Sequence, residues 1–463
     1  MKQKHIQHLY WRAGFGVDFK NEEKLQKKTK SKIVSKLFSE SKEFIPLELD
    51  LSDIAIYKNK NYKELKSQYS KKELVEIQKN IRLKLRDLNS IWIERLTNSN
   101  QQLREKMTLF WANVFVCRDN NIFHIQQYNN TLRQHALGNF GDFVKAIAKE
   151  PSMSKYLNNR QNIKRSPNEN FARELMELFT LGIGNYTEQD IKESARAFTG
   201  WSFKENGAFF LRKKHHDYGV KTFFNKTGEF GGDDIIDIIL EQRQCAKFIC
   251  TKIYTYFVNP TVDENRLEEI TSIFYKDYNI AKLMKYIFKS KWFYNESNIG
   301  VKIKSPIELL VGIQKVVPLQ FEKPKQLNYL QKMMGQILLF PENVAGWKGG
   351  KSWIDANSLM FRLKLAALLL NKAVINLEEK GEFEDSFEKY YQKTKNRNRF
   401  IKTTVNWVSF DKMYQNSSTN DLINNLIVSK IDEDTYSYLK SLQVNSNRNF
   451  CVQLMSIPEY QLC

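Results

Sequence analysis

Residues that break helices are scarce in this chain. Its 463 residues include 19 glycines and 9 prolines, fewer than the many turns of an all-β protein would require. Hydrophobic residues make up 42% of the sequence and aromatic residues 13%, enough large side chains to bury a core and to offset the entropy lost on folding. The sequence therefore predicts an all-α globular fold, and its length allows two or three domains.

One lysine-rich segment, 57–88, contains the clearest helical periodicity. Between Ser70 and Leu96, apolar residues recur at spacings of three and four, which is typical of an amphipathic helix. These residues are Leu74, Ile77, Ile81, Leu85, Leu88 and Trp92. The pattern predicts a helix on the surface, or a flap.

We expect three regions along the chain. They are a charged N-terminal helical region at 1–100, a helical core at 101–320 and a C-terminal helical region at 321–463. Within the core, a glycine-rich stretch predicts a small irregular or β-hairpin insertion near 202–233. The charged segment 378–399 predicts a linker or an exposed helix.

The most sharply specified helix is predicted to begin at Ser166. Ser166 is a favourable N-cap, Pro167 suits the first helical position, and Glu169 can complete a capping box. A second helix is expected after Thr187, which is followed by acidic residues in the first turn. Two short helices would then form an αα-hairpin.

The chain is strongly basic. It has 72 lysines and arginines against 52 acidic residues, a formal net charge of +20, and such a positive field attracts phosphates, anionic polymers or an acidic membrane surface. The lysines are dispersed along the sequence, which is more typical of a solvated surface than of a nucleic-acid site. Nucleic acid is therefore a candidate partner, but not the favoured one.

The cysteines do not indicate a disulfide framework or a zinc site. Their number is odd and no C-x-x-C pair occurs, which favours buried free thiols. No run approaches the ~18 apolar residues that span a bilayer, and the N-terminus lacks the apolar segment of a signal peptide. As written, the sequence predicts a cytoplasmic protein without a transmembrane segment.

Several motifs, in order along the chain, resemble one bacterial family. The longest runs from Asn168 to Gly182 and continues through Tyr186–Asp190 and Ala197–Trp201. The others are Trp11–Gly16, Arg133–Phe140, His216–Asp217 with Lys221, Lys304–Glu308, Asn343–Gly350 with Trp353–Ile354, and Ser456–Gln461. Together they resemble the family called Domain of Unknown Function 1800, or DUF1800, over nearly the whole chain.

The resemblance implies no agreed reaction. Relatives often accompany a sulfatase-like companion family in bacterial envelopes, which makes such a protein a candidate partner and leaves an envelope-associated location open. Many relatives also carry histidines in a Phe-Trp-His-Asn-His-Phe run, where this chain has Ala112 and Val114, and Phe179 stands where histidine is common. Apolar groups offer no lone pair to a cation, so we expect weak or absent zinc binding and no tightly held metal.

The helix after Ser166 carries the first candidate site residues. Glu169, Arg173 and Glu177 follow one another at i,i+4 steps, which indicates a stabilised polar face. Glu174 lies at the border of the apolar face, where a carboxylate could have a raised pKa and act as an acid or base, or bind a metal together with Glu177. Structural pairing with an arginine is the more common outcome.

The glycine-rich insertion carries the second group of candidates. His216 and Asp217 could shuttle a proton or ligate a divalent metal, and the neighbouring cations could hold a phosphate, sulfate or carboxylate. The cations are Arg212, Lys213, Lys214 and Lys221. An exposed basic hairpin without chemistry explains the same residues equally well.

These observations lead to one preferred hypothesis and one alternative. The preferred hypothesis is an enzyme-like pocket that acts on an anionic substrate, with an unknown cofactor requirement. Its expected catalytic residues are Glu174, Glu177, His216 and Asp217, and its expected substrate-binding residues are Asn168, Arg173, Trp201 and Lys221. The alternative is a non-catalytic binding or assembly protein whose basic surface engages a partner protein, a polysaccharide or nucleic acid.

Overall fold

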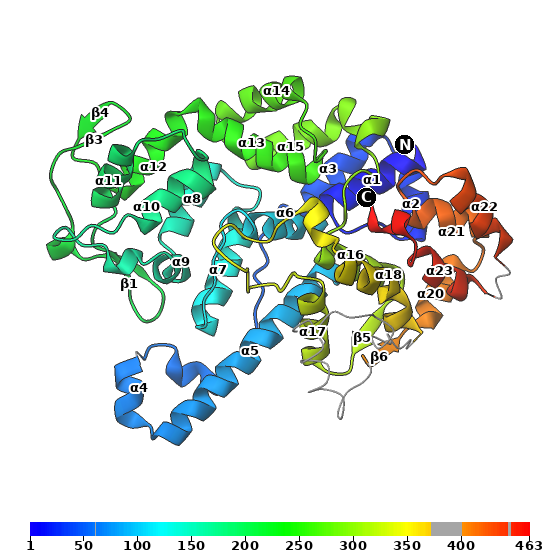
Figure 1. Cartoon of the computed structure of the whole chain (residues 1–463), viewed down its shortest axis with the longest axis horizontal. Helices are drawn as coiled ribbons and strands as arrows, with labels where there is room; N and C mark the ends of the chain where they lie inside the picture. The colour runs from blue at the N-terminus through cyan, green and yellow to red at the C-terminus, as the bar shows by residue number, and fades with distance from the viewer. Residues whose placement is uncertain (61, 372–400, 443–445) are drawn as a thin grey trace. The chain divides into compact units, whose positions relative to one another are not determined.

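The fold is known from a computed structural model that describes residues 1–60, 62–371, 401–442 and 446–463 (Figure 1). It is mainly helical, with short two-stranded antiparallel sheets, which confirms the all-α prediction. The predicted linker or helix at 378–399 lies outside the described residues. The chain forms two compact units, and each unit contains segments from more than one of the three predicted regions.

Unit 1 comprises residues 1–33, 294–337 and 348–463. Its helices are α1 (Gln3–Ala13), α2 (Phe19–Gln26), α16 (Pro306–Val316), α17 (Pro324–Met333), α18 (Ala356–Leu370), α20 (Trp407–Tyr414), α21 (Thr419–Leu426), α22 (Glu433–Ser441) and α23 (Asn447–Leu454). Its short 3-10 turns are η6 (Glu296–Asn298), η7 (Gly350–Trp353) and η8 (Pro458–Gln461), and its strands are β5 (Leu319–Phe321) and β6 (Thr403–Val405). Helix α3 (Lys30–Glu40) continues from unit 1 into unit 2, and η5 (Trp292–Tyr294) leads back.

Unit 2 comprises residues 34–293 and 338–347. Its longer helices are α4 (Tyr62–Gln68), α5 (Lys71–Asn98), α6 (Gln102–Ala112), α7 (Ile122–His135), α8 (Phe140–Ala148), α9 (Pro151–Tyr156), α11 (Glu188–Ala197), α12 (Gly232–Glu241), α13 (Arg243–Phe257), α14 (Glu264–Tyr275) and α15 (Ile280–Lys289). Its shorter elements are η1 (Ser52–Tyr57), η2 (Asn159–Gln161), α10 (Asn170–Glu174), η3 (Leu175–Thr180) and η4 (Lys213–His215).

The expected insertion forms two small hairpins. Strand β1 (Trp201–Phe203) pairs antiparallel with β2 (Phe209–Leu211), and β3 (Lys221–Phe223) pairs antiparallel with β4 (Lys226–Gly228). The hairpin prediction for 202–233 is thus confirmed. A third sheet, β5 with β6, lies in unit 1 and was not predicted, because each of its strands has only three residues.

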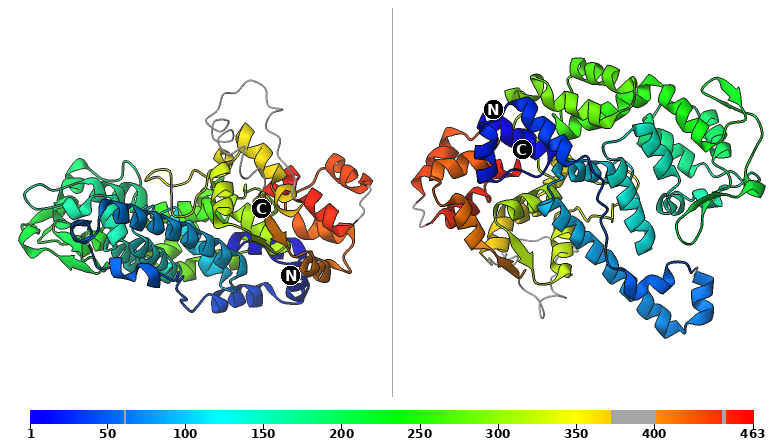
Figure 2. Two further views of the ribbon diagram at one scale, coloured as in Figure 1. Left: turned by 90° about the horizontal axis from the view of Figure 1, so that it is seen from below. Right: turned by 180° about the vertical axis from the view of Figure 1, so that it is seen from behind.

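Helix α5 confirms the periodicity seen in the sequence. Ser70 and Glu73 form a capping box in which each side chain accepts a hydrogen bond from the other residue's backbone N–H. Ile77, Leu85 and Leu88 are buried on the inner face. Figure 1 and the right-hand view of Figure 2 show α4 at the outer end of α5, away from the other helices of unit 2.

The start of the best-specified helix was predicted wrongly. Helix α10 begins at Asn170, and Ser166 instead forms a β-bridge with Ile163. Asn168 accepts a hydrogen bond from the backbone N–H of Asn170 at 3.1 Å, so an asparagine takes over part of the capping. The helix then widens into a π-helix, η3 (Leu175–Thr180). The prediction for Thr187 is confirmed, because it forms a capping box at the start of α11.

An aromatic cluster forms part of the core of unit 2. Trp111 stacks on Phe115 at a centroid distance of 5.7 Å, and Phe143 contacts both rings edge-on. Phe179 contacts Phe115 at 5.6 Å and is 1% exposed. Phe179, where the resemblance implies a histidine, is therefore a core residue in this chain.

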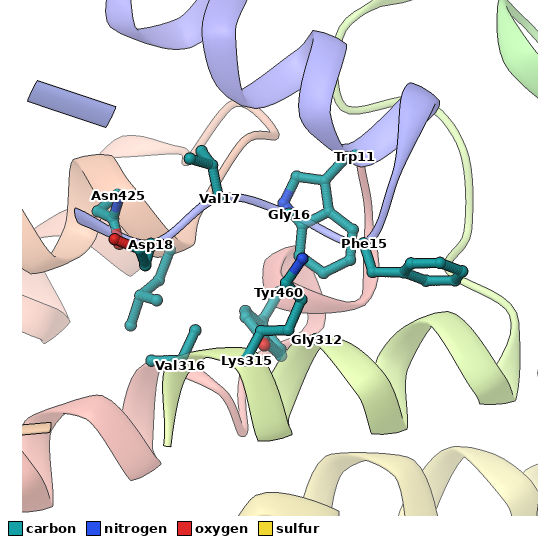
Figure 3. Close-up of a pocket in the computed structure, with 11 residues that line it drawn as sticks. Trp11, Phe15, Gly16, Val17, Asp18, Gly312, Lys315, Val316, Asn425 and Tyr460 are labelled. Carbon is teal, nitrogen blue, oxygen red and sulfur yellow. The ribbon is translucent and has the colours of Figure 1, made fainter. Parts of the chain in front are cut away.

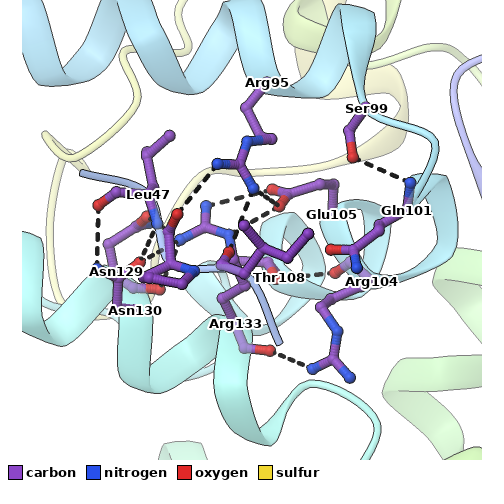
Figure 4. Close-up of polar contacts among 12 residues, drawn as sticks. Leu47, Arg95, Ser99, Gln101, Arg104, Glu105, Thr108, Asn129, Asn130 and Arg133 are labelled. Carbon is purple, nitrogen blue, oxygen red and sulfur yellow. Dashed lines mark hydrogen bonds and ion pairs between the residues drawn. The ribbon is translucent and has the colours of Figure 1, made fainter. Parts of the chain in front are cut away.

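A buried polar network attaches the segment after α3 to α6 and α7 (Figure 4). Glu105 pairs with Arg133, and both side chains are completely buried. Arg104 donates to the backbone oxygens of Ser41, Lys42, Arg133 and Gln134. Because each buried charge has a partner, the network offsets the cost of removing those charges from water.

All five cysteines are free and buried, as predicted. Burial raises the pKa of the Cys245 thiol to about 12, which makes it unreactive. Among the described residues, no helix is long and apolar enough to cross a membrane.

Candidate functional site

All eight predicted site residues lie in unit 2, where those on and around α10 are largely engaged in structural contacts. Arg173 donates to Glu188 at 2.9 and 3.0 Å and to Glu169 at 3.1 Å. Glu177 accepts a hydrogen bond from the Tyr186 hydroxyl at 2.9 Å. Arg173 and Glu177 therefore join α10 and η3 to the segment that leads into α11.

Glu174 differs from the other acidic residues of this helix. No hydrogen bond or ion pair involves its carboxylate among the described residues. Partial burial raises its pKa, and the nearby Glu177 carboxylate adds to the effect. Glu174 is the residue of this helix best suited to exchange a proton.

Asp217 and Lys221 hold their own loop together. Asp217 accepts from Arg196 Nε at 2.8 Å and from the Gly219 backbone N–H at 2.8 Å, and these bonds outweigh partial burial and lower its pKa. Lys221 is 1% exposed and donates to the carbonyl oxygens of Asp217 and Gly219, both at 2.8 Å. Lys221 therefore bonds within the loop, and Asp217 bonds both the loop and Arg196 of α11.

Helix α11 separates the two groups of predicted residues. Arg173 binds Glu188 at the start of α11, and Asp217 binds Arg196 near its end. These positions are eight residues apart, about 12 Å along a helix at ~1.5 Å per residue. The structure therefore brings both groups onto α11 but at opposite ends of it.

His216 is held in one orientation. Its ring Nδ1 lies 2.7 Å from the Thr199 carbonyl oxygen, which can only accept, so Nδ1 carries the hydrogen. The neutral ring then has its lone pair on Nε2. The side chain is 7% exposed and packs edge-on against Tyr218, which is 57% exposed. Such fixed tautomers suit a proton acceptor.

A close backbone contact places the His216 loop. Gly200 has φ +78°, and a Cβ there would lie 2.9 Å from the Arg212 carbonyl oxygen and 3.0 Å from the His216 nitrogen. The Gly200 N–H donates to the Asn162 carbonyl, and its carbonyl accepts from the Arg212 N–H. The Lys164 N–H donates to the His215 carbonyl at 2.9 Å. The loops 160–166 and 212–217 are thereby joined.

The joined loops carry a cluster of cations, which we call the basic cluster. It consists of Arg160, Lys164, Arg165, Arg212, Lys213 and Lys214. Five of the six are exposed, and Arg212 is half-buried. Within the described part of the chain, no carboxylate forms an ion pair with any of them. Their positive charge is therefore available to an anion from solution.

Two buried N–H donors accompany the basic cluster. Asn159, 1% exposed, uses its Oδ1 to accept from Asn162, but its Nδ2 has no partner among the described residues. The Nε of Arg212 is likewise buried without a partner, while its Nη2 donates to the Arg160 carbonyl. Unsatisfied donors of this kind favour an acceptor such as an oxyanion.

The basic cluster was only half found from the sequence. Arg212, Lys213 and Lys214 were singled out, but Arg160, Lys164 and Arg165 were not. The R-x-x-x-K-R spacing of the second group is too common to indicate a site. The tertiary fold brings the two groups together, through the backbone hydrogen bond from Lys164 to His215 and the side-chain hydrogen bond from Arg212 to the Arg160 carbonyl.

The predicted substrate-binding residues Trp201 and Asn168 are mainly structural. Trp201 is 6% exposed and packs edge-on against Phe198 and Phe209, with the Lys149 ammonium 5.5 Å from its ring centroid. The Asn168 backbone N–H donates to Asn162 Oδ1 at 2.9 Å. Both residues position the loops around the basic cluster.

A second polar cluster of unit 2 was missed from the sequence. Lys155 forms an ion pair with Asp119 and donates to His124 Nδ1, and His124 Nε2 lies 3.2 Å from the Glu205 carbonyl oxygen. Burial and the Lys155 charge lower the pKa of His124 to about 4. His124 is therefore neutral, and both its nitrogens are used to attach the β1–β2 hairpin to α7 and α9.

Unit 1 contains a small pocket built from the first and last motifs (Figure 3). Its lining includes Trp11, Phe15, Gly16, Lys315, Asn425 and Tyr460. The ammonium of Lys304, 0% exposed, lies 3.8 Å from the Trp11 ring centroid and 3.7 Å from that of Tyr460. This cation–π arrangement holds the two motifs together. No predicted site residue lines the pocket.

Metal ligands do not gather in the described residues, which contain no group of three or more His, Cys, Asp or Glu side chains able to hold an ion.

No curated protein and no solved structure matches the chain significantly. The model of the family described as "Protein of unknown function (DUF1800)" matches residues 8–462, and the chain belongs to that family.

Proposed function

We propose that this DUF1800 protein is an enzyme that acts on a substrate with a phosphate or sulfate ester group. The observation that carries the proposal is the basic cluster, whose cations lack carboxylate partners within the described chain. Lysine and arginine bind such oxyanions through charge-assisted hydrogen bonds. The buried donors Asn159 Nδ2 and Arg212 Nε suit the same kind of acceptor.

The proposed chemistry uses His216 as a proton acceptor. Its Nδ1 is bound to Thr199, so Nε2 can take a proton from a water or hydroxyl that attacks the phosphorus or sulfur atom of the ester. The bond from that atom to the ester oxygen breaks, and the alcohol leaves with the proton that His216 returns. Asp217 and Lys221 act as positioning residues, since their bonds close the loop that carries His216. Glu174 and Glu177, at the other end of α11, have no part in this step, and their acid–base role stays a separate prediction.

The test measures binding and turnover separately, with p-nitrophenyl phosphate and p-nitrophenyl sulfate as probes. The natural protein should bind at least one of the two esters. The variant K164Q/K213Q/K214Q should lose binding of each ester that the natural protein binds. The control K247Q/K276Q/K285Q removes three exposed lysines elsewhere in unit 2 and leaves the same net charge. Equal loss in the control would show a general charge effect and contradict the proposal.

His216 is tested by H216Q, which keeps a similar size and polarity. We expect ester binding to persist while turnover falls by about 10²–10⁴-fold, the usual contribution of a general base. Unchanged turnover in H216Q would remove His216 from the mechanism. E174Q, assayed in parallel, should leave turnover nearly unchanged if only His216 takes the proton.

A second candidate function is non-catalytic binding of single-stranded nucleic acid. The supporting observation is a set of exposed aromatics that flank the 212–217 loop in sequence, namely Phe209 and Phe210 on β2 and Tyr218 after the loop. Bases stack on such rings while cations hold the backbone. Anisotropy with a labelled oligonucleotide tests it: Y218A should weaken binding, and binding should fall steeply with salt.

The sulfatase-like companion that the resemblance names remains a further candidate partner, testable by co-purification.

A further inference from the structure

The outer face of α5 carries a continuous stripe of basic side chains. At ~100° per residue, six positions fall within about 100° of one another around the helix. They are Lys71, Lys72, Val75, Lys79, Arg82 and Arg86, all of them exposed. Five of the six are cations, so this face presents positive charge to solvent along about 22 Å, at ~1.5 Å per residue.

The stripe is turned outward by the packing of the opposite face. Ile77, Leu85 and Leu88 are 7%, 2% and 0% exposed, so the helix cannot rotate without exposing them. Of the stripe's cations, Lys79 pairs with Glu76 at 3.2 Å, and the others form no ion pair among the described residues. The packing of the apolar face of α5 therefore fixes the direction in which the basic side chains point.

Charge is concentrated in this part of the chain. Residues 56–86, which include α4 and most of α5, contain ten lysines and arginines against three glutamates. The excess of seven is about a third of the net charge of +20 carried by the whole chain. We call 56–86 the α4–α5 arm; α4 packs on α5 at its outer end (Figure 2).

Large aliphatic side chains are exposed among these cations. Ile56 and Val75 are each 59% exposed, and Leu83 is 45% exposed. Val75 lies in the middle of the basic stripe and Leu83 at its edge. Aliphatic groups interleaved with lysines match a surface that is anionic at its headgroups and apolar just beneath them.

We propose that the α4–α5 arm docks on an anionic phospholipid surface, with the stripe facing the headgroups and Val75 and Leu83 entering the interface. The positive stripe complements the negative potential of such a surface. Nucleic acid fits less well, because the exposed apolar groups of the stripe are aliphatic and offer no ring for stacking on bases. This site is separate from the basic cluster and does not depend on the proposed function.

The experiment is co-sedimentation of the full chain with vesicles of phosphatidylcholine and phosphatidylglycerol in equal parts, and with vesicles of phosphatidylcholine alone. We expect binding only to the anionic vesicles, weakening as salt rises. K72Q/K79Q/R86Q should bind roughly 100-fold more weakly, since each cation near the surface contributes about a factor of five. V75S/L83S keeps every charge and should also bind more weakly.

The control K164Q/K213Q/K214Q removes three cations from the basic cluster and should bind the vesicles like the natural protein. All substituted positions are exposed, so circular dichroism should show folded variants. Equal vesicle binding by K72Q/K79Q/R86Q and the natural protein would overturn the proposal. So would unchanged binding by V75S/L83S together with tighter binding of the full chain to duplex DNA than to the anionic vesicles, which would identify a nucleic acid as the partner.

Discussion

Arg133 and Glu105 form a completely buried ion pair held by two hydrogen bonds. Nε of Arg133 lies 2.7 Å from Oε1 of Glu105, and Nη2 lies 3.2 Å from Oε2. The Nη1 of Arg133 donates to Asn129 Oδ1 and Asn130 Oδ1, so the guanidinium has acceptors on both sides. Asn130 also bonds the backbone of Leu47, which connects the pair to the segment that precedes α4 (Figure 4).

Replacing Glu105 by leucine should destabilise the protein strongly. E105L leaves the Arg133 charge buried without its carboxylate, and breaking such a pair costs about 3–5 kcal/mol. Urea unfolding measures the loss. E76L, which makes the same substitution at the exposed partner of Lys79, is the matched control and should change stability by less than about 0.5 kcal/mol. A similar small effect in E105L would show that the pair is dispensable.

The sequence predicted elements whose signals are local. The helix within 70–96 was predicted from the spacing of its apolar residues, and the start at Thr187 from the acidic residues in the first turn, so both signals lie close together in sequence. The start at Ser166 was predicted wrongly because a tertiary contact competes with the local signal. Asn162 binds both the Asn168 backbone and the Ala195 carbonyl, and the helix begins only at Asn170. The π-helix at 175–180 has no comparable sequence signal.

Gly200→Ala should disturb the loop that carries His216. The positive φ of Gly200 is unfavourable for alanine, and the added Cβ would meet backbone atoms of Arg212 and His216. We expect a loss of stability on the order of 1–3 kcal/mol and a changed His216 ring signal in NMR spectra. Gly349→Ala is the control, since a Cβ there meets nothing within 4 Å. Equal effects of both variants would contradict the role of Gly200.

Glu150 should make stability depend on pH. Burial raises its pKa from the ordinary value of 4.5 to about 7, although Thr131 and Gln127 donate hydrogen bonds to it. The folded state therefore holds a proton that the unfolded state releases, so stability falls as pH rises from 4.5 to 7. The fall attributable to Glu150 should be about 3 kcal/mol at most.

The variant E150Q tests this dependence, because glutamine cannot lose the proton. Urea unfolding at several pH values should show that E150Q gains stability over the natural protein as pH rises toward 7. E264Q, at an exposed position, is the control for the substitution itself. Parallel pH profiles for E150Q and the natural protein would show that Glu150 does not titrate in this range.

The candidate site was less predictable than the fold. The sequence singled out His216 and its neighbouring cations. It could not show that Asp217 and Lys221 form hydrogen bonds within the segment 217–221. Nor could it show that Arg160 and Lys164 join Lys213, since these positions are about fifty residues apart in sequence. Side-chain type was readable from the sequence, whereas the partner of each side chain depends on the tertiary fold.

Restoring histidines at positions 112 and 114 should raise the affinity for transition metals if a site used by relatives has been lost here. Ala112 is half-buried at the end of α6 and Val114 is 5% exposed. Asn113 between them holds the Trp347 backbone by two hydrogen bonds, at 2.7 and 3.1 Å, so the backbone that would carry both imidazoles is fixed. Neutral imidazole binds zinc well, and apolar side chains do not.

The measurement is competition of A112H/V114H with a chromophoric chelator for Zn²⁺. We expect measurable zinc binding in this variant, and weak or absent binding in the natural protein. Two histidines placed at exposed positions elsewhere in unit 2, K247H/K276H, control for adventitious binding. One zinc per chain retained by the natural protein after dialysis against a chelator would contradict the hypothesis, because ligands other than positions 112, 114 and 179 would then be sufficient.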